Sequence, residues 1–329
     1  MSYVPLPLDP SDASVPSASS APSASSFEVV VARLRAAGCV FAEEEARLLL
    51  AAADRRSDRP AALAALVERR VAGLPLEHVL GWAEFCGLRV EVDPGVFVPR
   101  RRTEFLVRHA LVAARPGAVV VDLCCGSGAL GAAVAAGVAR RAGAGGGVGA
   151  GVGAGAGAGG GVELHAADID PASVRCARRN VAGFDGRAYG GDLYAALPDR
   201  LRGTVDVLLA NVPYVPTDEI DFLPAEARVY EARVALDGGR DGLDVLRRVA
   251  AGARSWLAPG GSLLFETGQR QTAAAVEAVV RGGLTARVET SDEWAATVVI
   301  GGRPGSGREH QPYRPGPSRP PRPSGPGPA

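Results

Sequence analysis

Residues 120–131 read VVDLCCGSGALG, an apolar run that ends at Asp122 and passes through a glycine-rich turn into an alanine-rich segment. Such a run, turn and segment predict a strand followed by a helix. At Gly126 and Gly128 the backbone can come close to a ligand because no Cβ intervenes. Gly131 completes a G-x-G-x-x-G spacing, which fits a nicotinamide dinucleotide, S-adenosylmethionine or simply a tight strand–helix turn.

Apolar β-like runs alternate with helical stretches beyond this turn. The predicted strands cover residues 119–123, 162–167, 205–210 and 261–266. Their order predicts an α/β fold with a doubly wound parallel sheet, in which ligands bind at the carboxyl ends of the strands. A Gly/Ala-rich insertion at 142–161 joins a predicted helix to a predicted strand, at the opposite edge, so we interpret it as a flexible insertion and not as a phosphate loop.

The remaining chain divides by composition. Residues 1–26 are rich in Ser, Pro and Ala, and residues 301–329 are rich in Pro, Gly and Arg, so both ends are predicted to be disordered. Helical spacing of apolar residues over 27–75 predicts a small helical domain. Alternation over 76–104 predicts a β-hairpin linker, which precedes the α/β domain at 105–300.

Composition narrows the function classes. In 329 residues, 36 basic side chains, all arginine, balance 36 acidic ones, so direct nucleic-acid binding is not expected. Five cysteines without a CxxC pair, and an amino terminus unlike a signal peptide, predict a cytoplasmic protein. Apolar runs are too short for a membrane span, and the histidines lack metal-ligand spacing. We expect a monomer without a metal.

Acidic residues stand at the ends of two predicted strands, and Asp192 follows a further short β-like segment. Asp122 ends the first, and Asp168 ends the second, where it could accept hydrogen bonds from ribose hydroxyls. Asp170 precedes a proline and is therefore the better candidate for the helix N-cap. Asp192 could accept the amino group of an adenine while Leu193 packs on the ring, although an acid solvated in a loop is the alternative.

The run at residues 205–210 leads into Asn211, Val212, Pro213 and Tyr214. An Asn-x-Pro-Tyr sequence at the end of a strand can hold a planar NH2 group. The Asn211 amide oxygen and a nearby backbone carbonyl would accept its two N–H bonds, and an aromatic ring would lie against its plane. This motif predicts transfer of a methyl group to an amide nitrogen or to an exocyclic amine.

Together these segments resemble the HemK/PrmC family of protein-(glutamine N5) methyltransferases. The resemblance covers residues 74–268, where VVDLCCGSGALG is similar to the family's DLGTGSG turn and LLANVPYVP to its NPPY motif. PLEHVLGWAEFCGLRVEVDPGVFVPRRRTEFLV resembles the linker hairpin with its PR-x-x-TE signature. LDGGRDGLDVLRRVAAGARSWLAPGGSLLFETG is similar to a later helix and strand.

The resemblance implies a Rossmann-like class I methyltransferase domain that uses S-adenosylmethionine, preceded by a helical domain that helps to bind the substrate. That substrate would be the glutamine of the GGQ motif in peptide-chain release factors, which act in translation termination. The implied catalytic residues are Asn211, Val212, Pro213 and Tyr214. The implied cofactor-binding residues are Asp122, Cys124, Gly126, Gly128, Asp168, Asp192, Leu193 and Asn211. Phe97 would lie against the glutamine amide, with Arg100 and Glu104 at the edge of the pocket.

Two residues depart from the family pattern. Cys124 stands at the first glycine of the turn, and Val212 replaces the first proline of NPPY. The Val212 carbonyl can still accept an amide proton, but the loop loses local rigidity. A divergent paralogue with another substrate, or a catalytically silent partner of the release factor, is therefore a competing interpretation.

Two other enzyme classes remain open. An adenine-N6 or similar nucleic-acid methyltransferase would use the same tetrapeptide, since it suits any planar NH2 group. An NAD-dependent oxidoreductase would use the glycine turn, but it leaves the motif at Asn211 unexplained.

Overall fold

The computed structural model describes residues 26–143 and 161–305. Most of each predicted disordered end and of the Gly/Ala-rich insertion lies outside these ranges. The chain divides into two compact units between Ala72 and Gly73. None of the described helices is long and apolar enough to cross a membrane.

The described part of the first unit consists of helices α1 (Ser26–Ala36), α2 (Ala42–Ala53) and α3 (Arg59–Val71). Their apolar residues recur at helical spacing, and Leu34 and Leu49 are completely buried. The bundle therefore has a small hydrophobic core of its own.

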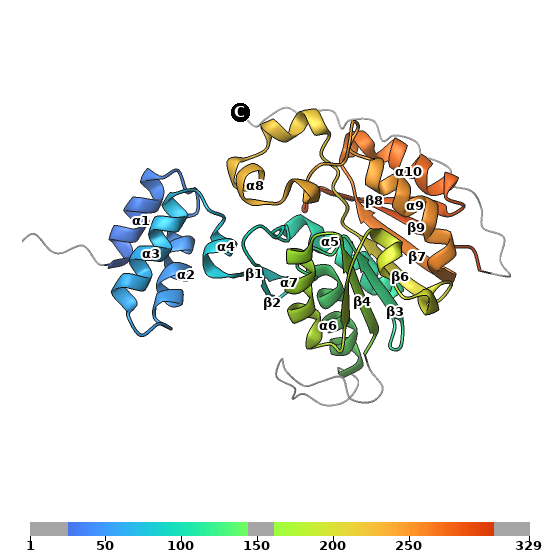
Figure 1. The fold of residues 1–329 in the computed structure, drawn as a ribbon, viewed down its shortest axis with the longest axis horizontal. Coiled ribbons are helices and arrows are strands. Elements are labelled where there is room, and N and C mark those ends of the chain that lie inside the picture. Colours follow the sequence, from blue (N-terminus) through green and yellow to red (C-terminus); the bar gives the residue numbers. More distant parts are fainter. Residues whose placement is uncertain (1–25, 144–160, 306–329) are drawn as a thin grey trace, which may run out of the picture. The chain divides into compact units, whose positions relative to one another are not determined.

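The second unit contains a sheet of seven described strands in the order β5-β4-β3-β6-β7-β9-β8 (Figure 1). The strands are β3 (Val119–Leu123), β4 (Glu163–Asp168), β5 (Arg187–Gly190), β6 (Val205–Ala210), β7 (Leu257–Glu266), β8 (Thr285–Ser291) and β9 (Ala296–Gly302). β3 to β7 run parallel, whereas β9 pairs antiparallel with both β7 and β8. The predicted α/β fold with a doubly wound, largely parallel sheet is confirmed, and the sheet ends in an antiparallel pair.

Helices cover both faces of this sheet. They are α5 (Glu104–Ala113), α6 (Ala129–Gly143) and α7 (Pro171–Ala182) on one face, and α9 (Asp244–Trp256) and α10 (Thr272–Arg281) on the other. The short helices α4 (Leu76–Leu80) and α8 (Ala225–Tyr230) lie in the connections before β1 and after β6. Val120 packs in a core with α5, α6 and α7, whereas its neighbour Val121 packs in a second core with α9 and α10. Successive residues of a strand point to opposite faces, so β3 is apolar throughout. Short 3-10 helices lie at Arg101–Thr103, Leu193–Ala196, Asp199–Leu201, Thr217–Phe222, Arg233–Ala235 and Gln269–Gln271.

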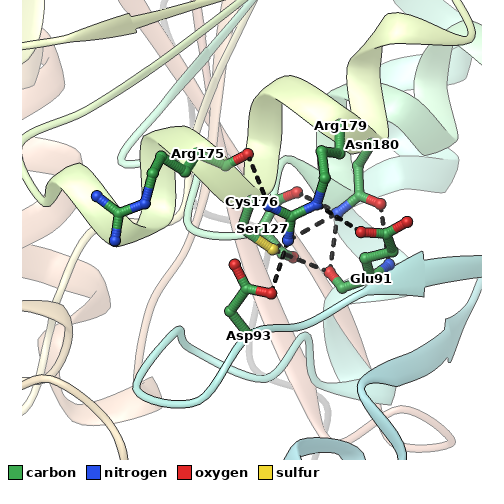
Figure 2. Close-up of polar contacts among 7 residues, drawn as sticks. All are labelled: Glu91, Asp93, Ser127, Arg175, Cys176, Arg179 and Asn180. Carbon is green, nitrogen blue, oxygen red and sulfur yellow. Dashed lines mark hydrogen bonds and ion pairs between the residues drawn. The ribbon is translucent and has the colours of Figure 1, made fainter.

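The hairpin of β1 (Trp82–Phe85) and β2 (Leu88–Glu91) belongs to the second compact unit. Figure 2 shows how α7 holds it. The Asn180 side chain accepts from the Glu91 N–H at 2.9 Å and donates to the Glu91 carbonyl at 2.8 Å. It also donates to the Ser127 carbonyl at 2.8 Å. One amide therefore ties the hairpin to the glycine-rich turn.

Gly128 lets α6 pack closely on α7. Its φ is +77°, and a Cβ there would lie 3.1 Å from Ala177 Cβ and 3.2 Å from Ala177 Cα. A side chain at this position would be strained both by the left-handed backbone and by contact with the helix backbone. Gly128 is thus required by the packing of these two helices.

We therefore expect Gly128→Ala to lower the free energy of unfolding by about 2 kcal/mol. Gly183→Ala is the matched control, because Gly183 has a helical φ of −64° and a Cβ there would meet nothing within 4 Å. Urea denaturation without added ligand measures both changes. Equal stabilities for the two variants would contradict this account of Gly128.

Candidate functional site

A cavity of about 660 Å³ opens at the carboxyl ends of the parallel strands. This is the edge at which doubly wound sheets bind ligands. Most of the predicted site residues line it, namely Phe97, Arg100, Cys124, Gly126, Asp168, Asp192, Leu193, Asn211, Val212, Pro213 and Tyr214. The fold thus brings together segments that are more than 100 residues apart in the sequence.

Asp122 does not line the cavity and lies completely buried at the end of β3. Its Oδ2 accepts a hydrogen bond from the Gly131 N–H at 2.9 Å, while Oδ1 is buried without a described partner. Burial raises the pKa of the Asp122 carboxyl to about 8, against the opposing effect of the Gly131 N–H. Asp122 therefore supports the start of α6 from inside the protein.

This raised pKa predicts a dependence of stability on pH. Between about pH 4 and pH 8 the folded protein keeps a proton on Asp122 that the unfolded chain has lost. The Asp122 contribution to stability therefore falls as pH rises through this window, with a slope of up to about 1.4 kcal/mol per unit, and levels off above it. Asp122→Asn removes this contribution. Urea midpoints between pH 5 and 9 test it, and a pH-independent difference between variant and wild type would contradict it.

Glu104 and Gly128 also lie outside the lining of the cavity. Glu104 Oε1 accepts from the backbone N–H of Cys86, in the turn of the β1–β2 hairpin, at 3.1 Å. Gly128 packs against α7 as described above. The resemblance implied that Glu104 contacts the substrate and that Gly128 contacts the cofactor. In the structure both residues instead make contacts within the protein.

Cys124 adopts a left-handed backbone with φ +53°. Glycine adopts this conformation without strain, whereas a residue with a Cβ is strained by roughly 1–2 kcal/mol. The turn thus holds a non-glycine residue in a conformation that favours glycine. Burial, together with the nearby carboxylate of Asp168, raises the pKa of the Cys124 thiol, so that it stays neutral.

Asp168 joins the end of β4 to the glycine-rich turn. Its Oδ2 accepts from the Gly126 N–H and its Oδ1 from the Asp170 N–H, each at 2.9 Å. Burial raises its pKa, and these two N–H groups oppose the shift. Asp170 caps α7 through the N–H groups of Ala172 and Ser173 at 3.3 and 2.9 Å, so the predicted N-cap is confirmed. Asp168 is therefore not the N-cap, and it lines the cavity.

Asp192 forms an ion pair at 2.5 Å with Arg248 of α9, and both residues line the cavity. Neighbouring Leu193 has a left-handed φ of +48° and also lines it. Sequence reasoning did not find Arg248, because 56 residues separate it from its partner and its neighbours form an ordinary amphipathic helix. Only the packing of α9 beside the short helix Leu193–Ala196 brings the charges together.

The residues from Asn211 to Tyr214 continue from β6 along the wall of the cavity. No described residue hydrogen-bonds to the Asn211 side-chain amide, which leaves it available to a ligand. Val212 is only 3% exposed and packs in the core beside α9 and α10. The motif thus places Asn211 in the cavity lining without a described hydrogen-bond partner and anchors the side chain of Val212 in the core.

Tyr214 is held by a residue that sequence reasoning did not single out. Arg102 donates to the Tyr214 hydroxyl, and its guanidinium pairs with Glu266 at 2.7 Å. Glu266 also accepts from the Thr103 hydroxyl at 2.7 Å. Burial raises the pKa of Tyr214, so the phenol stays neutral in the cavity.

Phe97 and Arg100 both line the cavity and contact each other. The Arg100 guanidinium lies 4.9 Å from the centre of the Phe97 ring. It also contacts both carboxylate oxygens of Glu231, each at 2.7 Å. Glu231 is 5% exposed and accepts from the Val98 N–H at 3.1 Å as well. The charge of Arg100 is therefore balanced inside the protein by a residue from beyond α8.

Within residues 26–143 and 161–305, no group of three or more His, Cys, Asp or Glu side chains could hold a metal ion.

Comparison with known proteins agrees with these motifs. No family model matches the chain. It is 36% identical over 273 residues to a release factor glutamine methyltransferase of Mycolicibacterium smegmatis, covering 78% of this chain and 88% of that protein. It is 34% identical over 247 residues to one of Geobacter sulfurreducens, covering 74% and 78%. A 4-amino-L-phenylalanine/4-methylamino-L-phenylalanine methyltransferase of Streptomyces pristinaespiralis is 35% identical over 63% of this chain and 66% of that protein.

Solved structures show weaker likeness. A methyltransferase from Pyrococcus furiosus aligns with a TM-score of 0.44 at 16% identity, over 66% of this chain and 90% of that one. Two relatives are 34% and 36% identical to this chain over most of their length. The NVPY motif and the glycine-rich turn also line one cavity, as expected for a shared site. The chain belongs to the family of release factor glutamine methyltransferases.

Proposed function

We propose that this protein transfers a methyl group from S-adenosylmethionine to the side-chain amide nitrogen of glutamine in the GGQ motif of peptide-chain release factors. The observation that carries the proposal is that Asn211 lines the same cavity as Asp168 and Asp192, and that no described residue hydrogen-bonds to its side-chain amide. Family membership supports the reaction and the class of substrate.

The cavity suits the cofactor in size and chemistry. Its volume of about 660 Å³ lies within the range of small-molecule sites. Asp168 would accept the ribose hydroxyls, Asp192 and Leu193 would hold the adenine, and the turn from Cys124 to Gly126 would lie along the methionine end. When bound, S-adenosylmethionine supplies an electrophilic methyl group on its sulfonium.

The residues of the chain act on the acceptor amide. A neutral amide is a poor nucleophile, so alignment and exclusion of water supply most of the catalysis. The Asn211 Oδ1 and the Val212 carbonyl would accept the two N–H bonds of the acceptor and stabilise the positive charge that develops on its nitrogen. The rings of Phe97 and Tyr214 would hold the plane of the amide. No strong base would be required for attack. As the bond from the sulfonium to the methyl group breaks and the bond to nitrogen forms, the nitrogen would lose one of its two protons to solvent.

A second candidate substrate is a small aromatic amine. The Streptomyces pristinaespiralis relative is named for methylation of 4-amino-L-phenylalanine, whose amino group is also attached to a planar system. The same pair of acceptors would suit it. The formal net charge of zero disfavours a nucleic-acid substrate.

Mass spectrometry tests the proposal directly. Purified, unmethylated release factor is incubated with this protein and S-adenosylmethionine, and fragmentation locates the added methyl group. We expect one methyl on the GGQ glutamine. Cofactor binding without transfer would overturn the proposed substrate, and a parallel assay with 4-amino-L-phenylalanine then separates the aromatic-amine enzyme from a silent paralogue.

A further inference from the structure

The side chain of Gln271 joins the loop at Tyr214, the last residue of the Asn211–Tyr214 tetrapeptide, to the loop at Asp241. Its Nε2 donates to the carbonyls of Tyr214 and Asp241, both at 2.9 Å, and its Oε1 accepts from the Gly268 N–H at 3.3 Å. Because two partners are acceptors and the third is a donor, only one orientation of the amide satisfies all three. We call these three hydrogen bonds the Gln271 clasp.

The loop at Asp241 and Gly242, which also takes part in the Gln271 clasp, packs closely against Tyr214. Gly242 has φ +75°, and a Cβ there would lie 2.2 Å from the Tyr214 carbonyl oxygen and 2.3 Å from Gln271 Nε2. Val215 extends the contact, since its N–H donates to the Leu236 carbonyl at 3.1 Å and its carbonyl accepts from the Gly238 N–H at 2.9 Å. The downstream end of the tetrapeptide is therefore fixed to its neighbours through backbone groups.

The upstream end lacks a restraint that the family motif has. Val212 stands where the family's NPPY motif has its first proline, and only proline fixes its own φ. No described residue accepts a hydrogen bond from the Val212 N–H, so a proline there would remove no backbone bond of the described structure. A restraint on Tyr214 can replace the missing one, because Val212 and Tyr214 are separated by a single residue, Pro213.

We propose that Gln271 is a positioning residue for methyl transfer: by holding the Tyr214 carbonyl, it directs the Val212 carbonyl and the Tyr214 ring toward the acceptor nitrogen. This proposal rests on the proposed function for its catalytic consequence. The clasp and a proline at position 212 are then alternative restraints on one loop. Each can partly replace the other.

Kinetics of Gln271→Leu and Gln271→Glu test the clasp, since both variants keep the size of the side chain and lose both donors. We expect kcat toward the release factor to fall about 10- to 100-fold, while cofactor affinity stays within about twofold. Gln269→Leu is the matched control, because Gln269 is exposed in the same short helix and should leave kcat unchanged. Thermal denaturation confirms that each variant is folded.

Rescue separates positioning from a purely structural role. Val212→Pro in the Gln271→Leu chain should recover most of the lost kcat. A wild-type kcat in both Gln271 variants, absence of rescue, or a Val212→Pro single variant as slow as Gln271→Leu would each overturn the proposal.

Amide hydrogen exchange tests the restraint on the loop without any substrate. Without release factor, Gln271→Leu should accelerate amide exchange at Val215 and Gly238 at least about tenfold, and Gln269→Leu should not. If this difference appears but the wild type does not methylate the release factor, only the proposed function fails. Unchanged exchange together with unchanged kcat overturns the clasp alone.

Discussion

Replacing Asn211 with alanine is expected to lower kcat for methyl transfer about 10²- to 10³-fold while the affinity for S-adenosylmethionine changes less than about threefold. Asn211 lines the cavity, and no described residue hydrogen-bonds to its side-chain amide. Its removal therefore leaves no protein group without a partner. What is lost is one of the two acceptors that would orient the substrate NH2 and stabilise its developing charge.

Steady-state kinetics with release factor, together with calorimetry of cofactor binding, measure the two quantities separately. Thr217→Ala is a suitable control farther along the same loop, since its hydroxyl donates to Asp237 outside the cavity. It should turn over at nearly the wild-type rate. An Asn211→Ala variant with wild-type kcat would remove Asn211 from the catalytic site.

The second large effect is expected at Asp168. Asp168→Ala should weaken cofactor binding about 100- to 1000-fold, because it removes the predicted acceptor of the ribose hydroxyls. It also leaves the Gly126 and Asp170 N–H groups without the carboxylate that they contact at 2.9 Å. Since Gly126 lies in the turn at the cofactor site, its displacement adds to the loss. The rate at saturating cofactor should fall much less.

Asp170→Ala is the comparison that separates cofactor binding from helix capping. Asp170 caps α7, so its loss should reduce the free energy of unfolding by about 1 kcal/mol. Its effect on cofactor affinity should remain below about threefold. Calorimetry measures the cofactor affinity of the Asp168→Ala and Asp170→Ala variants, and urea denaturation measures their stability. Equal cofactor affinities for the two variants would contradict the role given to Asp168.

Local sequence rules were sufficient to predict the positions of several residues of the site. The proline after Asp170 identified the N-cap, and the structure confirms it, because capping depends on residues within one turn. The order of apolar runs predicted the parallel sheet, and a parallel sheet gathers its strand ends at one edge. Asp168, Asp192 and Asn211 therefore meet in one cavity, as their positions after strands implied.

Other contacts depend on pairing over long distances. Glu231 lies 131 residues after Arg100 in the sequence, and Gln271 lies 57 residues after Tyr214. Nothing local marks either of them, because a buried glutamate and a glutamine at a helix start look the same as solvated ones. Asp122 and Glu104 belong to recognisable motifs, yet both make contacts within the protein and do not line the cavity. Whether a motif residue reaches the cavity depends on how the surrounding elements pack, which the motif does not show.

The sequence by itself determined the class of fold, the edge of the sheet at which ligands bind and the type of group that Asn211 can hold, since periodicity, turns and motif chemistry are local properties. Only the tertiary structure decided which charges are balanced inside the protein and how the loop at Val212 is restrained. These depend on the meeting of distant segments such as α9 with the loop at Asp192 and the start of α10 with Tyr214. Close packing brings such groups within hydrogen-bonding distance, and no short stretch of sequence encodes that distance.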